Sequence, residues 1–351
     1  MDKKNKKIRL ALLGCWHVHT FMYLPLLLED PKNPVEFTVV WDEDAGRGQD
    51  AAKRLGIPFE PDLEKALTDY ESLGVIIQCA TTSHKKAVLC AAARKKHIFC
   101  EKVLAPSVEE CLKIQRAVRQ NHVKFMISLD ALPYGVYHFA KELIRKGYLG
   151  QIGSAYVRRV HGMAYGEEGG LPDYWYDNRQ TAGGATIDLG THGLSLLSWL
   201  FGRAKDVTAL TQSRLGNGQD DVSTLVIRFE NGVLAASHTS FLAAHLENYV
   251  EIIGNQGRLA ILGFIGLNQD RIRVFLQSDL LPGFEAGKEV SPEELPDTSP
   301  LTIQQFIYLL QSEEQEIPDY GMEEAIQLTK LVEGAYQSAA LGRTICLSEF
   351  F

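Results

Sequence analysis

The sequence predicts a doubly wound α/β region followed by an α+β region. Over about the first 130 residues, short apolar runs alternate with helical stretches, in units short enough for strand-helix-strand crossovers. The apolar runs are continuous, which indicates strands buried on both faces of a parallel sheet covered by helices. After about residue 150 the runs alternate between apolar and polar residues, which predicts an antiparallel sheet with one packed face. We expect two domains, residues 1–129 and 130–351.

The elements of the first domain follow in regular order. Strands are expected at residues 7–14, 35–44, 73–81, 97–102 and 124–130, where apolar and β-branched residues cluster. Helices are expected between them, at residues 19–30, 46–57, 61–69, 83–96 and 107–122. Gly56 stands where a left-handed residue commonly ends a helix, at the end of the second of these.

The second domain is expected to contain hairpins. Strands are predicted at residues 155–163, 207–216, 222–241 and 248–262, with tight turns at Asn231-Gly232 and near Gly254 to Gly257. Helices are predicted at residues 135–150, 183–202 and 320–342. Residues 280–300 are rich in proline and acidic side chains, so we expect a surface loop there.

Composition excludes several classes of protein. The 351 residues carry a net charge of −8, which leaves no basic footprint for nucleic acid or an anionic membrane. No apolar run approaches the roughly 20 residues that span a bilayer. Six cysteines are scattered without CxxC spacing, as is typical of free thiols in a reducing compartment. We therefore expect a cytoplasmic protein that binds neither nucleic acid nor membrane.

The stretch "LALLGCWHVHT", residues 10–20, suggests a loop for the pyrophosphate of a dinucleotide. Gly14 fits the turn after the first strand, but Trp16 and His19 stand where two further glycines are usual. Asp42, at the end of the next strand, suits hydrogen bonds to an adenosine ribose and would repel a 2'-phosphate. NAD is therefore expected and NADP is less favoured, although Asp42 could instead only cap the following helix.

The same loop admits a second interpretation, because His17 and His19 form a His-x-His pattern at a strand end, as in many metal-dependent hydrolases. In a metal-dependent α/β barrel further ligands would come from later strands, whereas this chain becomes antiparallel where such a barrel needs its fifth to eighth strands. A metal site outside a barrel remains the lesser alternative, and we expect no metal.

Two distant stretches have the composition of an active site. Lys102 follows Glu101 at the carboxyl edge of the predicted sheet, where open α/β folds bind ligands. Asp188 and His192 are spaced i, i+4, so on a helix they share a face and can hydrogen-bond. A histidine oriented by a carboxylate suits a general base, although a structural Asp-His pair would have the same spacing.

These pieces resemble the Gfo/Idh/MocA family of oxidoreductases, named for glucose-fructose oxidoreductase, inositol dehydrogenase and a rhizopine-catabolism protein. The resemblance runs from about residue 8 to 345. Its carriers are "LALLG" with Asp42, "GIPFEPDLEKAL", "KKHIFCEKVLA", "AKELIRKGYLGQIG", "AGGATIDLGTHGLSLLSWL", "VIRFENGVLA" and "EIIGNQGRLAI".

The resemblance implies an N-terminal Rossmann domain and an NAD-dependent dehydrogenase that moves a hydride between nicotinamide and a sugar, cyclitol or related polyol. His192 would remove the proton of the substrate hydroxyl, Asp188 would orient the His192 ring, and Lys102 would stabilise charge on the substrate oxygen. The predicted cofactor-binding residues are Gly14, Cys15, Trp16, His17, Val18, Asp42, Ala80, Thr81, His84, Glu101 and Lys102. We expect the backbone N–H groups of residues 15–18 to face the pyrophosphate, with Trp16 and His17 close to the cofactor.

Several positions depart from the family pattern. Val103 replaces the proline of the Glu-Lys-Pro segment, His84 matches its segment only with a gap, and Ser195 replaces a frequent aspartate. The substrate pocket is therefore expected to have diverged. Candidate pocket residues are Asp130, Tyr134, His161, Tyr165, Trp175 and Arg179.

Two other functions remain open. One is an NAD-binding regulator without turnover, and the other is an NAD-retaining enzyme that cleaves glycosides through a keto-sugar. An open sheet with a free face also predicts a homodimer or homotetramer formed through the C-terminal sheet.

Overall fold

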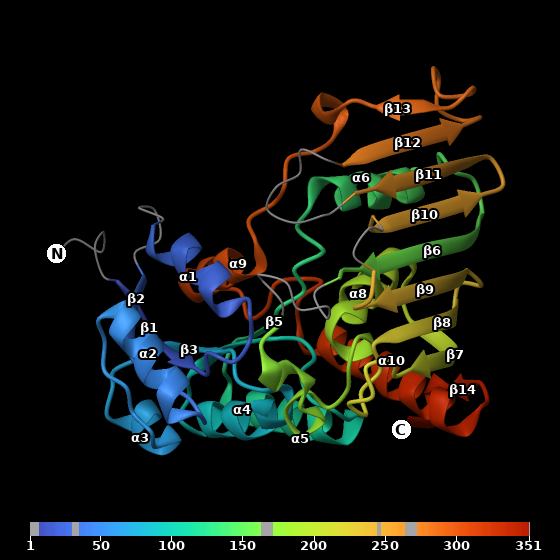
Figure 1. Ribbon diagram of the computed structural model, residues 1–351. Helices are drawn as coiled ribbons and strands as arrows, with labels where there is room; N and C mark the ends of the chain where they lie inside the picture. The colour runs from blue at the N-terminus through green and yellow to red at the C-terminus, as the bar shows by residue number, and fades with distance from the viewer. Residues whose placement is uncertain (1–6, 30–34, 163–170, 244–246, 264–271, 351) are drawn as a thin grey trace. The chain divides into compact units, whose positions relative to one another are not determined.

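The computed structural model describes residues 7–29, 35–162, 171–243, 247–263 and 272–350. The chain forms two compact units (Figure 1). The first comprises residues 1–128 and 300–329, and the second comprises residues 129–299 and 330–351. Residues 300–329 thus cluster with the first unit, whereas the predicted second domain ran over residues 130–351.

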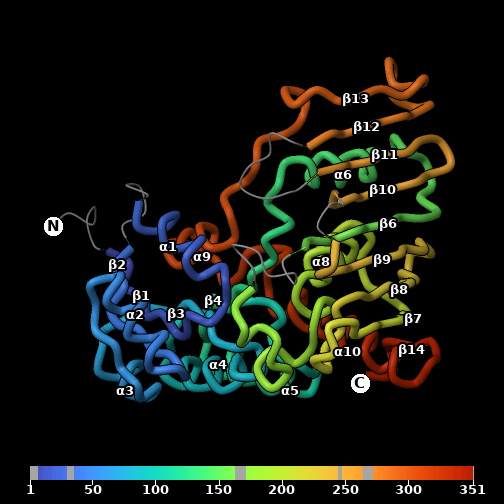
Figure 2. The backbone as a smooth tube through the Cα atoms, in the orientation of Figure 1, coloured from blue at the N-terminus to red at the C-terminus, as the bar shows by residue number. Residues whose placement is uncertain are grey.

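Specific contacts hold this returning segment in the first unit. The Lys124 ammonium donates to the backbone oxygens of Leu309 and Ser312 at 2.8 and 2.7 Å. The rings of Phe99 and Phe306 lie 5.7 Å apart between centroids. Helix α9 (Thr302–Gln311) also packs beside α1 (Thr20–Leu28), as Figures 1 and 2 show.

The first unit contains a five-stranded parallel sheet in the order β2-β1-β3-β4-β5. An isolated parallel bridge between Val40 and Phe59 adds a vestigial strand outside β2, which gives the strand order of a Rossmann fold. The predicted doubly wound fold is confirmed. The strands are β1 (Ile8–Leu13), β2 (Val35–Trp41), β3 (Gly74–Ile77), β4 (His97–Cys100) and β5 (Phe125–Ile127).

Helices follow the strands as predicted, and their ends have clear chemical causes. The side chains of Asp44, Asp62 and Ser107 each accept a backbone N–H from the first turn of the helix they precede. Gly56 ends its helix with φ +68°. The helices are α2 (Ala45–Leu55), α3 (Leu63–Thr68), α4 (His84–Ala93) and α5 (Val108–Asn121), together with α1 and α9.

The second unit contains a nine-stranded sheet in the order β13-β12-β11-β10-β6-β9-β8-β7-β14. The β6–β9 pair is parallel and the other pairs are antiparallel, so the predicted mostly antiparallel sheet is confirmed. The strands are β6 (Ile152–Val160), β7 (Ala204–Gln212), β8 (Val222–Phe229), β9 (Leu234–Ser240), β10 (Tyr249–Gly254), β11 (Gly257–Leu262), β12 (Arg273–Ser278), β13 (Lys288–Val290) and β14 (Ile345–Cys346).

The prediction that residues 280–300 form only a loop is wrong, because β13 lies within them. This edge strand is three residues long and only Val290 is buried, so its sequence shows no alternation of apolar and polar residues that would predict a strand. Helices of this unit are α6 (Gly135–Arg145), α7 (Asn178–Thr181) and α8 (Thr191–Phe201); α10 (Met322–Leu341) begins in the first unit and continues into this one from residue 330.

One face of the large sheet is packed and the other is open. Along β8, Leu225, Ile227 and Phe229 are buried while the residues between them are exposed. The packed face contacts α8 through β6 and β9. This arrangement gives the alternating pattern that the sequence predicted.

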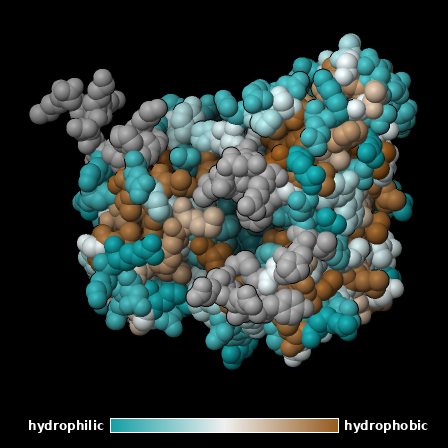
Figure 3. All heavy atoms as spheres, turned by 45° about the horizontal axis from the view of Figure 1, so that its top comes forward, coloured by the Kyte–Doolittle hydropathy of each residue, from teal (hydrophilic) through white to brown (hydrophobic). Residues whose placement is uncertain are grey.

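The surface and the cysteines agree with the composition. Polar and apolar side chains are interspersed over the face in view in Figure 3. Among the described residues, no helix is both long and apolar enough to cross a membrane. All six cysteines are free thiols.

Candidate cofactor and active site

The turn after β1 requires glycine at position 14. Gly14 has φ +92°, and its N–H donates to the Trp41 oxygen at 2.6 Å. A Cβ atom there would lie 2.3 Å from the Cys79 nitrogen, which belongs to the backbone after β3 and cannot move aside. Gly14 therefore has the turn-making role that the sequence assigned to it.

The next residues of the loop use their N–H groups internally. Cys15 N–H donates to Asp42, and those of Trp16 and His17 donate to the Gln78 oxygen at 3.1 and 3.0 Å. The prediction that these N–H groups face a pyrophosphate is therefore wrong for residues 15–17. Trp16 and His17 are buried, whereas Val18 is 37% exposed and lies at the loop surface.

Asp42 sits at the end of β2, as predicted, but its carboxylate already has four donors. Oδ2 accepts from Cys15 N–H at 2.6 Å and from Arg47 Nε at 3.0 Å. Oδ1 accepts from Asp44 N–H at 2.8 Å and from Arg47 Nη2 at 2.6 Å. A ribose can bind Asp42 only by displacing the Arg47 side chain, which is itself 20% exposed. The Arg47 charge also weakens the predicted repulsion of a 2'-phosphate.

A cavity of about 510 Å³ lies beside Asp42, entirely within the first unit. It is at the carboxyl end of β2, where nucleotide-binding sheets receive the adenosine part of the cofactor. Its lining is rich in carboxylates, together with one indole and one ammonium group. The lining residues are Trp41, Asp42, Glu43, Ala45, Pro61, Asp62, Leu63, Glu64, Lys86 and Cys90.

His84 has a positioning role and does not offer its ring to a cofactor in this structure. The ring is buried, with Nδ1 2.8 Å from the Val103 oxygen and Nε2 3.1 Å from the Cys79 oxygen. Burial lowers its pKa. It joins the end of β3 to the segment after β4. Ala80 and Thr81, also predicted as cofactor-binding, are buried beside it at the end of β3.

Glu101 and Lys102 follow β4, at the predicted edge of the sheet. Glu101 is fully buried; its Oε1 lies 3.2 Å from His19 Nδ1 and accepts from Gln78 Nε2 at 3.3 Å. Burial raises the Glu101 pKa, but His17, His19 and Lys102 outweigh it and hold the pKa well below its usual value. Lys102 is 5% exposed, and the peptide bond between Lys102 and Val103 is cis.

The glycine-containing stretch of the second unit is held by Asp220. The N–H groups of Gly184 and Thr186 donate to the Asp220 carboxylate at 2.9 and 2.8 Å, and the Thr186 hydroxyl donates at 2.6 Å. Tyr336 donates its hydroxyl to the same carboxylate at 2.7 Å. A Cβ on Gly184 would overlap the Asp220 backbone oxygen, so glycine is required there.

This anchored stretch continues into a π-helical turn, Thr186–Gly190, and then into α8. The single helix predicted over residues 183–202 is therefore wrong at its start. Asp188 lies in the π turn and His192 in the α-helix, so the i, i+4 spacing no longer guarantees a shared face. The hydrogen bond between Asp188 and His192 stays a prediction.

Two of the predicted pocket residues interact with Asp188, one through a hydrogen bond and one through the Asp188 charge. Trp175 is buried, and its Nε1 donates to Asp188 Oδ2 at 3.2 Å. His161 stacks on Phe241 with ring centroids 4.9 Å apart. Burial lowers the His161 pKa, and the nearby Asp188 charge offsets part of that shift. The structure thus brings Asp188, Trp175 and His161 together.

The remaining pocket candidates are scattered. Tyr134 is buried, and burial together with Asp130 raises its pKa to about 12. Arg179 is 90% exposed and pairs with Asp177, which does not support a place in a substrate pocket. Tyr165 lies outside the described residues.

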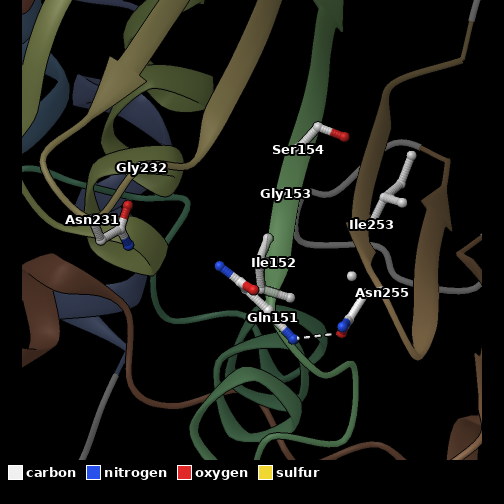
Figure 4. Close-up of a pocket in the computed structure, with 9 residues that line it drawn as sticks. Gln151, Ile152, Gly153, Ser154, Asn231, Gly232, Ile253 and Asn255 are labelled. Carbon is white, nitrogen blue, oxygen red and sulfur yellow. Dashed lines mark hydrogen bonds between the residues drawn. The ribbon is translucent and has the colours of Figure 1, made fainter.

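A second cavity, of about 410 Å³, lies at the turn end of the large sheet (Figure 4). Asn255 accepts the Gln151 N–H at 2.8 Å beside it. Its lining offers no titratable side chain, so it lacks the groups for acid-base chemistry. The lining residues are Gln151, Ile152, Gly153, Ser154, Asn231, Gly232, Ile253, Gly254 and Asn255.

Comparison with known proteins decides the family. Residues 8–129 match the model of an oxidoreductase family with an NAD-binding Rossmann fold, and residues 137–260 match the Gfo/Idh/MocA C-terminal domain. The chain belongs to this family. Its first unit is therefore built on the NAD-binding Rossmann domain of the Gfo/Idh/MocA oxidoreductases, as the resemblance predicted.

Named relatives are distant. A 2,7-anhydro-N-acetylneuraminate hydratase from Escherichia coli is 26% identical over 232 residues, which is 64% of this chain and 60% of that protein. A levoglucosan dehydrogenase from Pseudarthrobacter phenanthrenivorans is 25% identical over 299 residues, 77% of this chain and 75% of that protein. The chain spans about 60% of the length of the first curated relatives that it matches.

Solved structures share the fold. The WlbA dehydrogenase from Bordetella pertussis, crystallised with NADH and UDP-GlcNAcA, has a TM-score of 0.79 and 21% identity. The match covers 97% of this chain and 99% of that one. At 21% sequence identity, this structural similarity establishes the fold alone.

Sequence reasoning missed three residues that organise these sites: Arg47, Asp220 and Tyr336. Arg47 stands five residues after Asp42 in a polar helix start, where an arginine usually faces solvent. Asp220 lies 36 positions from Gly184, and no local pattern links the two. The one sequence feature that could have indicated an anchor is the adjacent pair Asp220-Asp221. Both side chains are buried, and Asp221 accepts the N–H groups of Arg214 and Leu215.

Proposed function

We propose that this protein is an NAD-dependent oxidoreductase acting on a sugar, a cyclitol or a related polyol or keto derivative. The cavity beside Asp42 is the observation that carries the proposal. It lies at the nucleotide edge of a Rossmann sheet, next to a turn where only glycine fits. The residues present fit the adenosine part of NAD: an acidic side chain for the ribose and an indole and a proline for the base.

The nicotinamide would supply the hydride acceptor or donor. His192 is proposed to take the proton of the substrate hydroxyl, and Asp188 to stabilise the resulting imidazolium. Trp175 holds Asp188 through its indole N–H, and the Asp220 anchor fixes the turn on which Asp188 lies. Lys102 is proposed to stabilise negative charge on the substrate oxygen.

Cofactor reduction tests this proposal. NAD and NADP are offered in parallel with a panel of polyols, inositols and aldoses, and NADH formation is followed by absorbance. His192→Ala is expected to lose at least about 100-fold in turnover while keeping its NADH affinity, because general-base catalysis contributes that much. Full turnover in His192→Ala would remove the proposed base.

A second candidate is a reaction without net redox change, in which NAD is retained. The similarity to a protein named as a hydratase supports it, because hydration is not a net oxidation. Product formation from a glycoside or anhydro-sugar without accumulation of NADH would favour this candidate. NADH formation in proportion to product would favour the dehydrogenase.

We also propose a homodimer or homotetramer formed through the open face of the large sheet. Leu210, Val226, Leu234 and Ile253 lie on that face and are 75%, 44%, 48% and 41% exposed. Burying these side chains against a second copy would remove apolar area from water. A Leu210→Lys variant that sediments as the parent does would contradict this interface.

A further inference from the structure

The loop after β1 and the end of β4 bring two imidazoles and one carboxylate together within the first unit. The ligand atoms of His17, His19 and Glu101 all lie within 4.8 Å of one another. His19 Nδ1 is 3.2 Å from Glu101 Oε1, and His17 Nε2 is 3.8 Å from Glu101 Oε2. We propose that these three side chains form a binding site for a divalent transition metal ion of the zinc class.

The spacing suits such an ion. Ligands about 2.0–2.1 Å from a tetrahedral zinc ion are separated from each other by roughly 3.3–3.4 Å. The two separations from Glu101, one to each carboxylate oxygen, bracket that value, and all three ligand atoms lie within 4.8 Å of one another. Two histidines and one glutamate are also the donor set of catalytic zinc sites that keep a position open for water or substrate.

The surroundings are those of an ordered metal ligand. Glu101 is fully buried, and its carboxylate is held by Gln78 Nε2 at 3.3 Å and by the Lys102 N–H at 3.2 Å. Outer hydrogen bonds of this kind fix the orientation of ligands and strengthen metal binding. The Tyr23 hydroxyl lies 3.2 Å from His19 Nδ1 and 2.9 Å from Ser128 Oγ, so an ion at Nδ1 would displace the first contact while the second can remain.

Local hydrogen bonds and a nearby charge oppose the binding of a metal ion at this site. His17 Nδ1 accepts the His19 N–H at 3.2 Å, so a neutral His17 carries its proton on Nε2. A metal ion can bind His17 Nε2 only if the proton on that nitrogen moves to Nδ1. Nδ1 then no longer accepts the His19 N–H, so this long hydrogen bond is lost. The positive charge of Lys102, next to Glu101, also opposes a dication. The opposing terms are the loss of two long contacts, at His17 Nδ1 and at His19 Nδ1, and one charge, against three ligand bonds.

None of the three proposed ligands is a proposed catalytic group, although Glu101 directly precedes Lys102 and was predicted to bind the cofactor. His17 was expected to lie close to the cofactor and His19 was not, and the loop N–H groups of residues 15–17 are engaged elsewhere. The metal proposal therefore gives these imidazoles a role that needs neither NAD nor a sugar. NADH affinity, measured separately, tests the cofactor proposal and leaves the metal proposal unaffected.

The test uses full-length protein without a histidine tag, stripped with chelator and dialysed against Co²⁺ or Zn²⁺. Three variants are compared with the parent. His17→Asn keeps an acceptor for the His19 N–H, and Glu101→Gln keeps the acceptor for Gln78. His122→Asn is the matched control, because His122 is an exposed, left-handed helix end with φ 54°, which asparagine tolerates.

The parent and His122→Asn are expected to retain about one ion per chain, and His17→Asn and Glu101→Gln to bind at least about tenfold more weakly. Zinc should also raise the melting temperature of the parent and of the control, but not of His17→Asn. His19→Gln replaces any variant that does not fold. The proposal is overturned if the parent retains no more metal than His17→Asn or His19→Gln.

Discussion

The turn at residues 14–19 of the first unit and the turn at residues 183–190 of the second are built in the same way, with different consequences. Each contains a glycine that no other residue can replace and is anchored by a buried aspartate from another element. Asp42 shares its carboxylate between two backbone N–H groups and the Arg47 guanidinium. Asp220 accepts only from neutral donors: two backbone N–H groups and two hydroxyls.

This difference in donors suits the Asp42 carboxylate to binding a ligand and the Asp220 carboxylate to holding a turn. Arg47 lies partly at the surface, and we propose that ribose hydroxyls displace it from Asp42. The partners of Asp220 are backbone groups, the Thr186 hydroxyl and the partly buried Tyr336, whose pKa is raised well above its usual value by desolvation and by Asp220. Tyr336 therefore stays a neutral donor, and Asp220 is committed to holding the turn that carries Asp188.

The largest expected effect is on stability at Asp220. Asp220→Ala leaves four buried donors without an acceptor, and we expect the free energy of unfolding to fall by about 3 kcal/mol or more. Tyr336→Phe removes one hydroxyl and should cost about 1 kcal/mol. Denaturant unfolding measures both. Equal losses in the two variants would contradict the anchoring role of Asp220.

Gly14→Ala tests the other turn against a matched glycine. Gly14 and Gly232 have φ of +92° and +90°, but a Cβ on Gly232 meets nothing within 4 Å. Gly232→Ala should therefore cost about 1–2 kcal/mol from the left-handed backbone alone. Gly14→Ala should cost clearly more, because the Cys79 backbone is in the way. Similar melting temperatures for the two variants would show that the crowding at Gly14 is relieved.

Arg47→Met tests whether Asp42 is the exchangeable carboxylate. Loss of the guanidinium should leave Asp42 open to ribose hydroxyls and remove a partner for a 2'-phosphate. We expect the ratio of the Kd for NADPH to the Kd for NADH to rise by about tenfold, equivalent to about 1.4 kcal/mol. Titration with both reduced cofactors gives the ratio. An unchanged ratio would place the 2' position away from Arg47.

The smallest effect is a pH dependence at His84. Burial lowers the pKa of His84 in the folded protein below its value of 6.5 in the unfolded chain. The unfolded chain therefore binds more protons, and this residue makes stability fall as pH decreases through 6.5. His84→Asn keeps a donor toward the Val103 oxygen and should flatten that decline. Parallel curves of unfolding free energy against pH for parent and variant would contradict the buried neutral ring.

Strand positions and strand-end residues could be predicted from the sequence, whereas the contacts that anchor the two turns could not. Residues 10–13 and 98–100 are continuous apolar runs and β8 alternates, so strand type and sheet class follow from local pattern. Gly14, Asp42 and Lys102 stand at strand ends, where position alone identifies them. The ion pair of Asp42 with Arg47 and the anchor of Gly184 on Asp220 depend on tertiary contacts. The π turn before α8 depends on that same anchor, so a helical pattern over residues 183–202 could not predict it.

The most direct test of the cofactor site is NADH titration of the parent, Ala45→Trp and Ala286→Trp. Ala45 is exposed and lines the cavity beside Asp42, and Ala286 is exposed in the second unit. We predict that the parent and Ala286→Trp bind NADH with equal affinity, whereas Ala45→Trp binds at least about tenfold more weakly because the indole fills the cavity. Undiminished NADH binding by Ala45→Trp, or no binding by the parent, would contradict the assignment of this cavity to NAD.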